Sequence, residues 1–137
     1  MAQSAYVTMG GPKCVTSKAI TEDHTDTTVV AAELPAGAWV PPYGVTVYVA
    51  EAFAGGTPKL NVGDGTTADG FVDEDDITEA TPGCYSGTAA NAAYSDTGRY
   101  YSSADTVDVT VSAGLTGGTA YVFVQYYDFS DRDLAAN

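Results

Sequence analysis

Alternating apolar and polar residues mark two strands between residues 106 and 128. Val107, Val109 and Val111 alternate with threonine, aspartate and serine, which is the pattern of a strand with one buried and one wet face. The next run, Ala120–Tyr127, is rich in β-branched and aromatic residues, and a glycine-rich connection separates the two. The pattern predicts a β-hairpin. Because a lone hairpin is marginal in water, we expect a second sheet to cover its apolar face.

Earlier segments supply candidates for that second sheet. Gly44–Ala52 carries three alternating valines, which we expect to face the valines of the C-terminal strands, and Pro58–Gly63 is a third alternating strand. Lys13–Glu22 and Thr28–Glu33 alternate more weakly and are also interpreted as strands. The pair Pro41-Pro42 lacks backbone donors, so sheet pairing should stop there or run along an edge.

The composition agrees with short strands joined by turns. The 137 residues include 15 Gly, ten Tyr and six Pro, and a chain of this length forms one domain with one modest core. The prediction is an all-β, single-domain antiparallel β-sandwich of jelly-roll type. We expect an N-terminal arm or edge strands at 1–27, the sandwich core at 28–128 and a polar tail at 129–137. Helix is expected only in a short piece such as Glu74–Ala80.

The charge narrows the choice of partners. Eighteen acidic residues against five basic ones give a net charge of -13, which argues against nucleic acid because phosphate binding needs clustered lysine and arginine. Cations or a basic protein surface are the attractive partners. No apolar run is long enough for a membrane span.

The start of the chain predicts the compartment in which it is made. MAQSAYVTMGG has neither the basic nor the apolar region of an export signal, so we expect synthesis in a reducing cytoplasm. Free thiols are then expected at Cys14 and Cys84, with a disulfide between them as the less favoured alternative.

An acidic stretch is the candidate metal site. Its aspartates lie close in sequence, and Gly65 and Gly70 give the backbone freedom that oxygen ligands need to converge on Ca²⁺. The second half of the stretch is similar to an EF-hand loop, whereas the first half lacks the expected ligands. A solvated acidic loop is the competing interpretation, and we expect no other cofactor. The candidate ligands are Asp64, Asp69, Asp73, Asp75 and Asp76.

No residue pattern marks a catalytic site. His24 lies near Asp23 and Asp26, but no nucleophile motif accompanies this base and acid. Pairs of carboxylates are unavoidable among 18 acids and so carry little information. The chain is therefore predicted not to be an enzyme.

Four segments in a fixed order resemble a group of small virion structural proteins of tailed bacteriophages. An LPAGA-type turn in Leu34–Val40 precedes the alternating strand Val45–Phe53, which runs through Glu-Ala-Phe. A Val-Gly-Asp…Ala-Asp-Gly loop lies in Gly55–Gly70, and Gly98–Asp128 closes the pattern. The resemblance covers residues 28–128.

The resemblance implies a β-rich, non-enzymatic, multimeric protein of the capsid decoration or cement type. Its expected partners are the major capsid protein and other copies of itself, with a trimer favoured, on the outer capsid surface of the virion. We expect the contacts at Met1–Gly11 and Leu34–Tyr43. A tail, neck or head-fibre component is one alternative. A carbohydrate-binding module that stacks sugars on Trp39 and surface tyrosines is the other.

Overall fold

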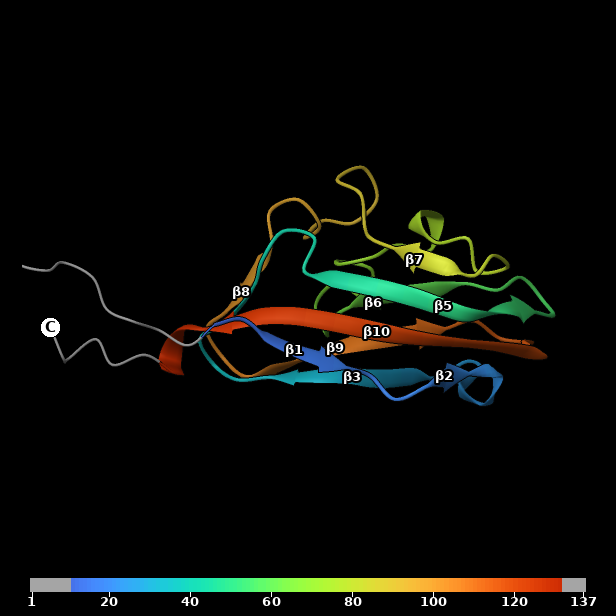
Figure 1. The fold of residues 1–137 in the computed structure, drawn as a ribbon, viewed down its shortest axis with the longest axis horizontal. Coiled ribbons are helices and arrows are strands. Elements are labelled where there is room, and N and C mark those ends of the chain that lie inside the picture. Colours follow the sequence, from blue (N-terminus) through green and yellow to red (C-terminus); the bar gives the residue numbers. More distant parts are fainter. Residues whose placement is uncertain (1–10, 132–137) are drawn as a thin grey trace, which may run out of the picture.

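The computed structural model of this chain describes residues 11–131, which form two antiparallel sheets joined by loops and single turns of 3₁₀ helix (Figure 1). The predicted all-β class is confirmed. Within residues 11–131 no helix is long and apolar enough to cross a membrane.

The larger sheet is built around β10, the longest strand. β10 pairs with β5 on one side and with β1 and β2 on the other, while its last two residues, Tyr127 and Asp128, pair with β4. β7 extends the sheet beyond β5, and β8 extends it beyond β4. The strands of this sheet are β1 (Lys13–Thr16), β2 (Ile20–Thr21), β4 (Ala38–Val40), β5 (Val45–Ala54), β7 (Gly83–Tyr85), β8 (Arg99–Tyr101) and β10 (Gly117–Asp128).

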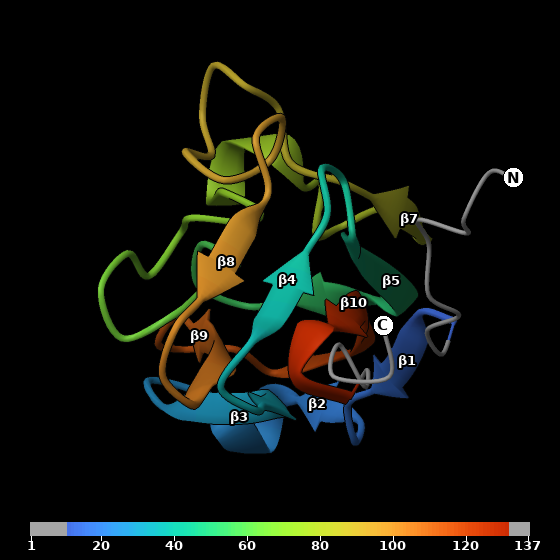
Figure 2. The same ribbon diagram turned by 90° about the vertical axis from the view of Figure 1, so that its left-hand side faces the viewer.

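The smaller sheet has the order β3-β9-β6. Its strands are β3 (Thr28–Leu34), β6 (Leu60–Gly63) and β9 (Asp105–Val111). In the end view of Figure 2, β4 and β8 lie between β3 and β9 in the lower part of the view and the loops at its top. The 3₁₀ helices are η1 (Glu22–His24), η2 (Glu74–Asp76) and η3 (Phe129–Asp131).

The core lies between the two sheets and is lined mainly by valine. Val47 and Val49 of β5 and Val122 of β10 are fully buried, as are Val107 and Val109 of β9 from the other sheet. Leu60 and Val62 of β6 also point inward, as their alternation predicted. The expected opposition of the β5 and β9 valines across the core is therefore confirmed.

The predicted C-terminal hairpin is wrong, because β9 and β10 belong to different sheets. β9 pairs with β3 and β6, and the connection after it crosses the core to reach β10 beside β5. At this crossing the N–H of Thr116 donates to the carbonyl of Ala54 at 2.9 Å. A hairpin would place both valine rows on one face of one sheet, where neither could cover the other. With the crossing, each row buries the other.

Within residues 11–27, β1 and β2 are part of the larger sheet, since both pair with β10. The residues before Gly11 include most of the expected Met1–Gly11 contact and lie outside the described residues. At the other end, Phe129 packs on Trp39. The expected helix at Glu74–Ala80 is only the single turn η2.

Candidate functional site

The five aspartates of the predicted calcium site do not converge on one point. Asp64 is buried, Asp75 is exposed, and the others are half-buried around η2. Residues 11–131 contain no group of three or more acidic, histidine or cysteine side chains placed to hold a metal ion. Each aspartate therefore has to be considered by the contacts that it makes.

Asp76 joins η2 to the loop that follows β7. Its carboxylate accepts hydrogen bonds from the backbone N–H of Thr88 at 3.1 Å, the Thr88 hydroxyl at 2.7 Å and the Asn91 amide at 2.8 Å. Burial would raise the pKa of Asp76, but these hydrogen bonds outweigh it and hold the pKa below its usual value. The charged form of Asp76 thus fastens the loop.

Asp73 is the N-cap of η2, and its Oδ1 accepts the N–H of Asp75 at 2.8 Å. That backbone bond lowers the pKa of Asp73, yet burial and the neighbouring Asp69 carboxyl together raise it above its ordinary value. Asp69 and Asp73 are the candidate ligands that lie side by side. Two carboxylates supply too few of the six to eight oxygens that Ca²⁺ takes.

The arrangement therefore does not fit the predicted calcium site, because the oxygens of Asp64 and Asp76 are engaged by N–H and O–H donors that a cation would have to displace. We expect the melting temperature to be the same in millimolar Ca²⁺ and in excess chelator. A calcium-dependent rise in the melting temperature that Asp73→Asn abolishes would show instead that the loop rearranges around the ion.

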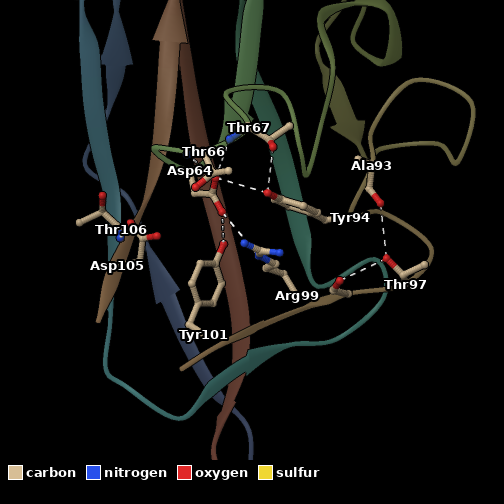
Figure 3. A network of polar contacts seen from close by, with 11 residues as sticks. Asp64, Thr66, Thr67, Ala93, Tyr94, Thr97, Arg99, Tyr101, Asp105 and Thr106 are labelled. Atoms are coloured by element: carbon tan, nitrogen blue, oxygen red, sulfur yellow. Dashed lines mark hydrogen bonds and ion pairs between the residues drawn. The ribbon is translucent and has the colours of Figure 1, made fainter. Parts of the chain in front are cut away.

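Asp64 is the centre of a buried network that the sequence did not reveal (Figure 3). It follows β6 directly, its side chain is 0% exposed, and its Oδ1 accepts the N–H groups of Thr66 and Thr67 at 2.9 and 2.8 Å. Its Oδ2 accepts the hydroxyl of Tyr101 on β8 at 2.8 Å and lies 3.9 Å from Arg99 Nε. One carboxylate thus ties a loop after β6 to β8.

Aromatic rings cover the charged part of this network. The Arg99 guanidinium lies 4.9 Å from the centre of the Tyr94 ring and 5.7 Å from that of Tyr101, within the range of cation–π attraction. Burial, followed by the hydrogen bond to Asp64, raises the pKa of Tyr101 above its ordinary value, so this tyrosine stays protonated as the donor. Both carboxylate oxygens of Asp64 therefore have hydrogen-bond donors within the fold, which indicates a structural role.

His24 also has a structural contact. It lies in η1, and its Nδ1 accepts the backbone N–H of Thr21 at 3.1 Å, which completes the cap of that turn. Cys14 and Cys84 are both exposed and form no disulfide.

An aromatic row on the end of the molecule is the surface that best fits a binding role. In register across β8, β4 and β10 lie Tyr100, Trp39 and Tyr127, so their side chains point to the same side. Phe129 stacks on Trp39 with ring centres 6.0 Å apart, and Tyr127 lies 5.9 Å from it. Tyr100 is 55% exposed. We call Trp39, Tyr100, Tyr127 and Phe129 the end row.

The end row lies partly in Leu34–Tyr43, the segment expected to make contacts. Trp39 comes from this segment, and the rest of the row comes from β8 and the end of β10. The sequence could not bring these segments together, because the pairing of β4 with both strands is long-range. Aromatic side chains are enriched where proteins meet.

Comparison with known proteins gives matches in structure only. No protein-family model matches the chain, and no curated protein matches it by sequence. One similar solved chain comes from the structure described as "Cyanophage Pam1 capsid asymmetric unit", with a TM-score of 0.63 and 19% identity over 93% of this chain and 91% of that one. Another comes from "Acidic stable capsid structure of Helicobacter pylori bacteriophage KHP30", with a TM-score of 0.64 and 17% identity over 87% of this chain and 89% of that one.

The fold is one found in bacteriophage capsids. The resemblance to β-rich virion proteins, seen in the sequence between residues 28 and 128, is thus confirmed for the fold. In both comparisons nearly the whole of each chain is matched, so this is a likeness of whole chains and not of a shared fragment.

Proposed function

We propose that this chain is a non-enzymatic structural protein of a bacteriophage virion, and more specifically a decoration or cement protein on the outer surface of the head. The observation that carries the proposal is the match in fold, over nearly the full length of both chains, to chains of two phage capsid structures. Its partner would be the major capsid protein, and it would act as a homo-oligomer, for which a trimer is the favoured state.

The described residues support a binding role over a catalytic one. The groove between β1 and β3, of about 590 Å³, is lined mostly by small and apolar residues, and its one histidine, His24, already uses Nδ1 in a backbone hydrogen bond. The buried Asp64 carboxylate is already engaged by the N–H groups of Thr66 and Thr67 and by the Tyr101 hydroxyl, with Arg99 beside it. A binding protein needs only surfaces.

We assign the shell contact to the end row. Its rings come from β8, β4 and the end of β10, and Tyr100 is 55% exposed. Aromatic residues are enriched at the centre of contacts between different proteins. A protein that binds only the assembled shell stabilises it by mass action.

The test uses phage heads that lack the protein. Purified chain is added to them, and binding is measured by co-sedimentation and head stability by the temperature at which DNA is released. We expect saturable binding and a higher release temperature, and Trp39→Ala should reduce both. Val30→Ala, at an exposed position of the smaller sheet, is the matched control and should bind as the wild type does.

Failure to bind heads would overturn the decoration role. Antibody labelling of intact virions would then distinguish a tail, neck or head-fibre location, which the same fold could serve.

A further inference from the structure

The outward face of the larger sheet carries a group of uncharged side chains that spans four neighbouring strands. Directly paired residues point to the same side of a sheet, so the pairing defines the rows of this face: Cys84–Tyr48–Tyr121, Thr46–Phe123–Thr16 and Gln125–Cys14. None of these side chains is charged. In Figure 1 the strands β1, β10 and β5 lie side by side and are viewed from this face. We call these eight residues the outer patch.

Aromatic rings occupy the centre of the outer patch. Tyr48 on β5 and Tyr121 on β10 are stacked with ring centres 6.4 Å apart and an angle of 20°. Tyr48 is 39% exposed and Phe123 is 36% exposed, so a large part of both rings faces outward. Exposed Cys14 and Cys84 lie at opposite margins of the patch.

The outward face of the smaller sheet provides the contrast. Asp108 of β9 lies opposite Val30 of β3, and Glu33 lies opposite Thr106, so this face carries two acids and no base among these positions. On the larger sheet the Thr119 hydroxyl lies 3.4 Å from the Glu51 carboxylate, beyond the outer patch along β10 and β5. The absence of charge thus belongs to one face of a strongly acidic chain.

Charge decides which partner fits the outer patch. Two copies of a chain with net charge -13 repel each other, and the repulsion is smallest where the surfaces that meet carry no carboxylate. A basic partner would instead be matched by an acidic face. The centre of a protein interface is depleted in charge and enriched in aromatic residues, as the outer patch is.

We propose that copies of this chain associate with one another through the outer patch. The inference deepens the proposed homo-oligomer by naming its contact surface. It concerns the purified chain without any shell, so it can fail while shell binding stands, and shell binding can fail while it stands.

The first experiment is sedimentation velocity of the full chain over a range of concentrations. We expect a reversible oligomer, and we expect Tyr48→Glu and Phe123→Glu each to weaken it by roughly tenfold or more, since a buried charge would replace an aromatic contact. Tyr100→Glu is the matched control, because it makes the same substitution at an exposed tyrosine of the end row. Circular dichroism checks that every variant is folded.

Three results would overturn the inference. The wild type could remain monomeric at millimolar concentration, the two outer-patch variants could assemble as the wild type does, or Tyr100→Glu could abolish assembly. The last result would assign self-association to the end row.

The two native thiols give an independent readout. Cys14 and Cys84 should react with a thiol reagent roughly tenfold or more slowly in the assembled state than after dilution to monomer, because the contact would cover both. Val30→Cys adds a thiol on the smaller sheet whose rate should not depend on concentration. Equal rates at both native cysteines in oligomer and monomer would exclude the outer patch.

Discussion

At the scale of single residues, Asp64 holds together more of the molecule than its place in a loop suggests. It accepts the N–H groups of Thr66 and Thr67 and the hydroxyl of Tyr101. Asp64→Ala would leave these donors without their acceptor, which costs about 1–3 kcal/mol of unfolding free energy for each donor that stays buried. Urea unfolding measures the loss.

The control for this variant is Asp96→Ala, at an exposed aspartate, which should unfold at the wild-type urea concentration. Tyr101→Phe should give a smaller loss, because it removes one donor and leaves Asp64 with the N–H groups of Thr66 and Thr67 and the Tyr94 hydroxyl. Wild-type stability in Asp64→Ala would show that the network contributes nothing.

Glu79 is a second residue whose surroundings predict a measurable effect. Burial raises its pKa above the usual value, although its Oε1 accepts the N–H of Leu60 at 2.9 Å. A carboxyl whose folded-state pKa is raised makes the fold less stable as the pH rises past the unfolded-state value and up to the folded-state one. Glu79→Gln keeps an acceptor for Leu60 and removes the charge.

We therefore expect Glu79→Gln to raise the melting temperature at pH 7 and to have little effect at pH 3.5, where Glu79 is protonated in both states. Thermal melts at the two pH values test this. A gain of equal size at both would mean that the charge is not the cause.

At the scale of elements, the crossing from β9 to β10 depends on glycine at one position. Gly118 has φ +122, and a Cβ on it would lie 2.3 Å from the Phe53 ring, whereas a Cβ on Gly117 would meet nothing within 4 Å. Gly118→Ala should therefore cost about 2–4 kcal/mol through backbone strain and overlap with a core side chain.

Gly117→Ala is the matched control for Gly118→Ala, one residue away on the same strand, and should change stability little. Chemical denaturation of both variants tests the pair. Equal effects would mean that Phe53 yields and that the approach of the two strands is not tight.

The sequence predicted which side of a strand is buried better than it predicted which strands pair. Alternating apolar residues identified the inward faces of β5, β6 and β9, because the period of a strand depends only on adjacent residues. Which strands pair is a long-range property, so the glycine-rich link after β9 looked like a hairpin turn and is a crossing between sheets. The short strands β7 and β8 have too few residues to show a period.

The same limit applies to the functional residues. The acidic stretch was visible as a cluster in sequence, but the fold directs Asp64 inward to Tyr101 on β8 and Asp76 towards Thr88. The end row and the outer patch each join residues from separate strands, and no local pattern marks such a set. Of the end row, only Trp39 was named from the sequence, as a surface on which sugars could stack; Cys14 and Cys84 of the outer patch were noted only as thiols.

At the scale of the whole molecule, the two sheets bury their valines against each other and leave two aromatic surfaces outside. The end row lies across β8, β4 and the end of β10, whereas the outer patch lies across β7, β5, β10 and β1 and carries no charge. A small protein of net charge -13 with two such surfaces can join copies of itself through one and a larger assembly through the other.

Salt should affect the two interactions in opposite directions, because charge repels one copy of the chain from another but attracts the chain to basic groups of the shell. Raising NaCl from about 0.1 M to about 1 M shortens the Debye length from roughly 10 Å to roughly 3 Å. Screening removes repulsion between acidic copies, so self-association through the uncharged outer patch should become stronger, as measured by sedimentation. Binding to heads, which we expect to use attraction between the acidic chain and basic shell groups, should become weaker in the same buffers. If self-association also weakened with salt, charged side chains would have to form that contact, and the outer patch would be the wrong surface.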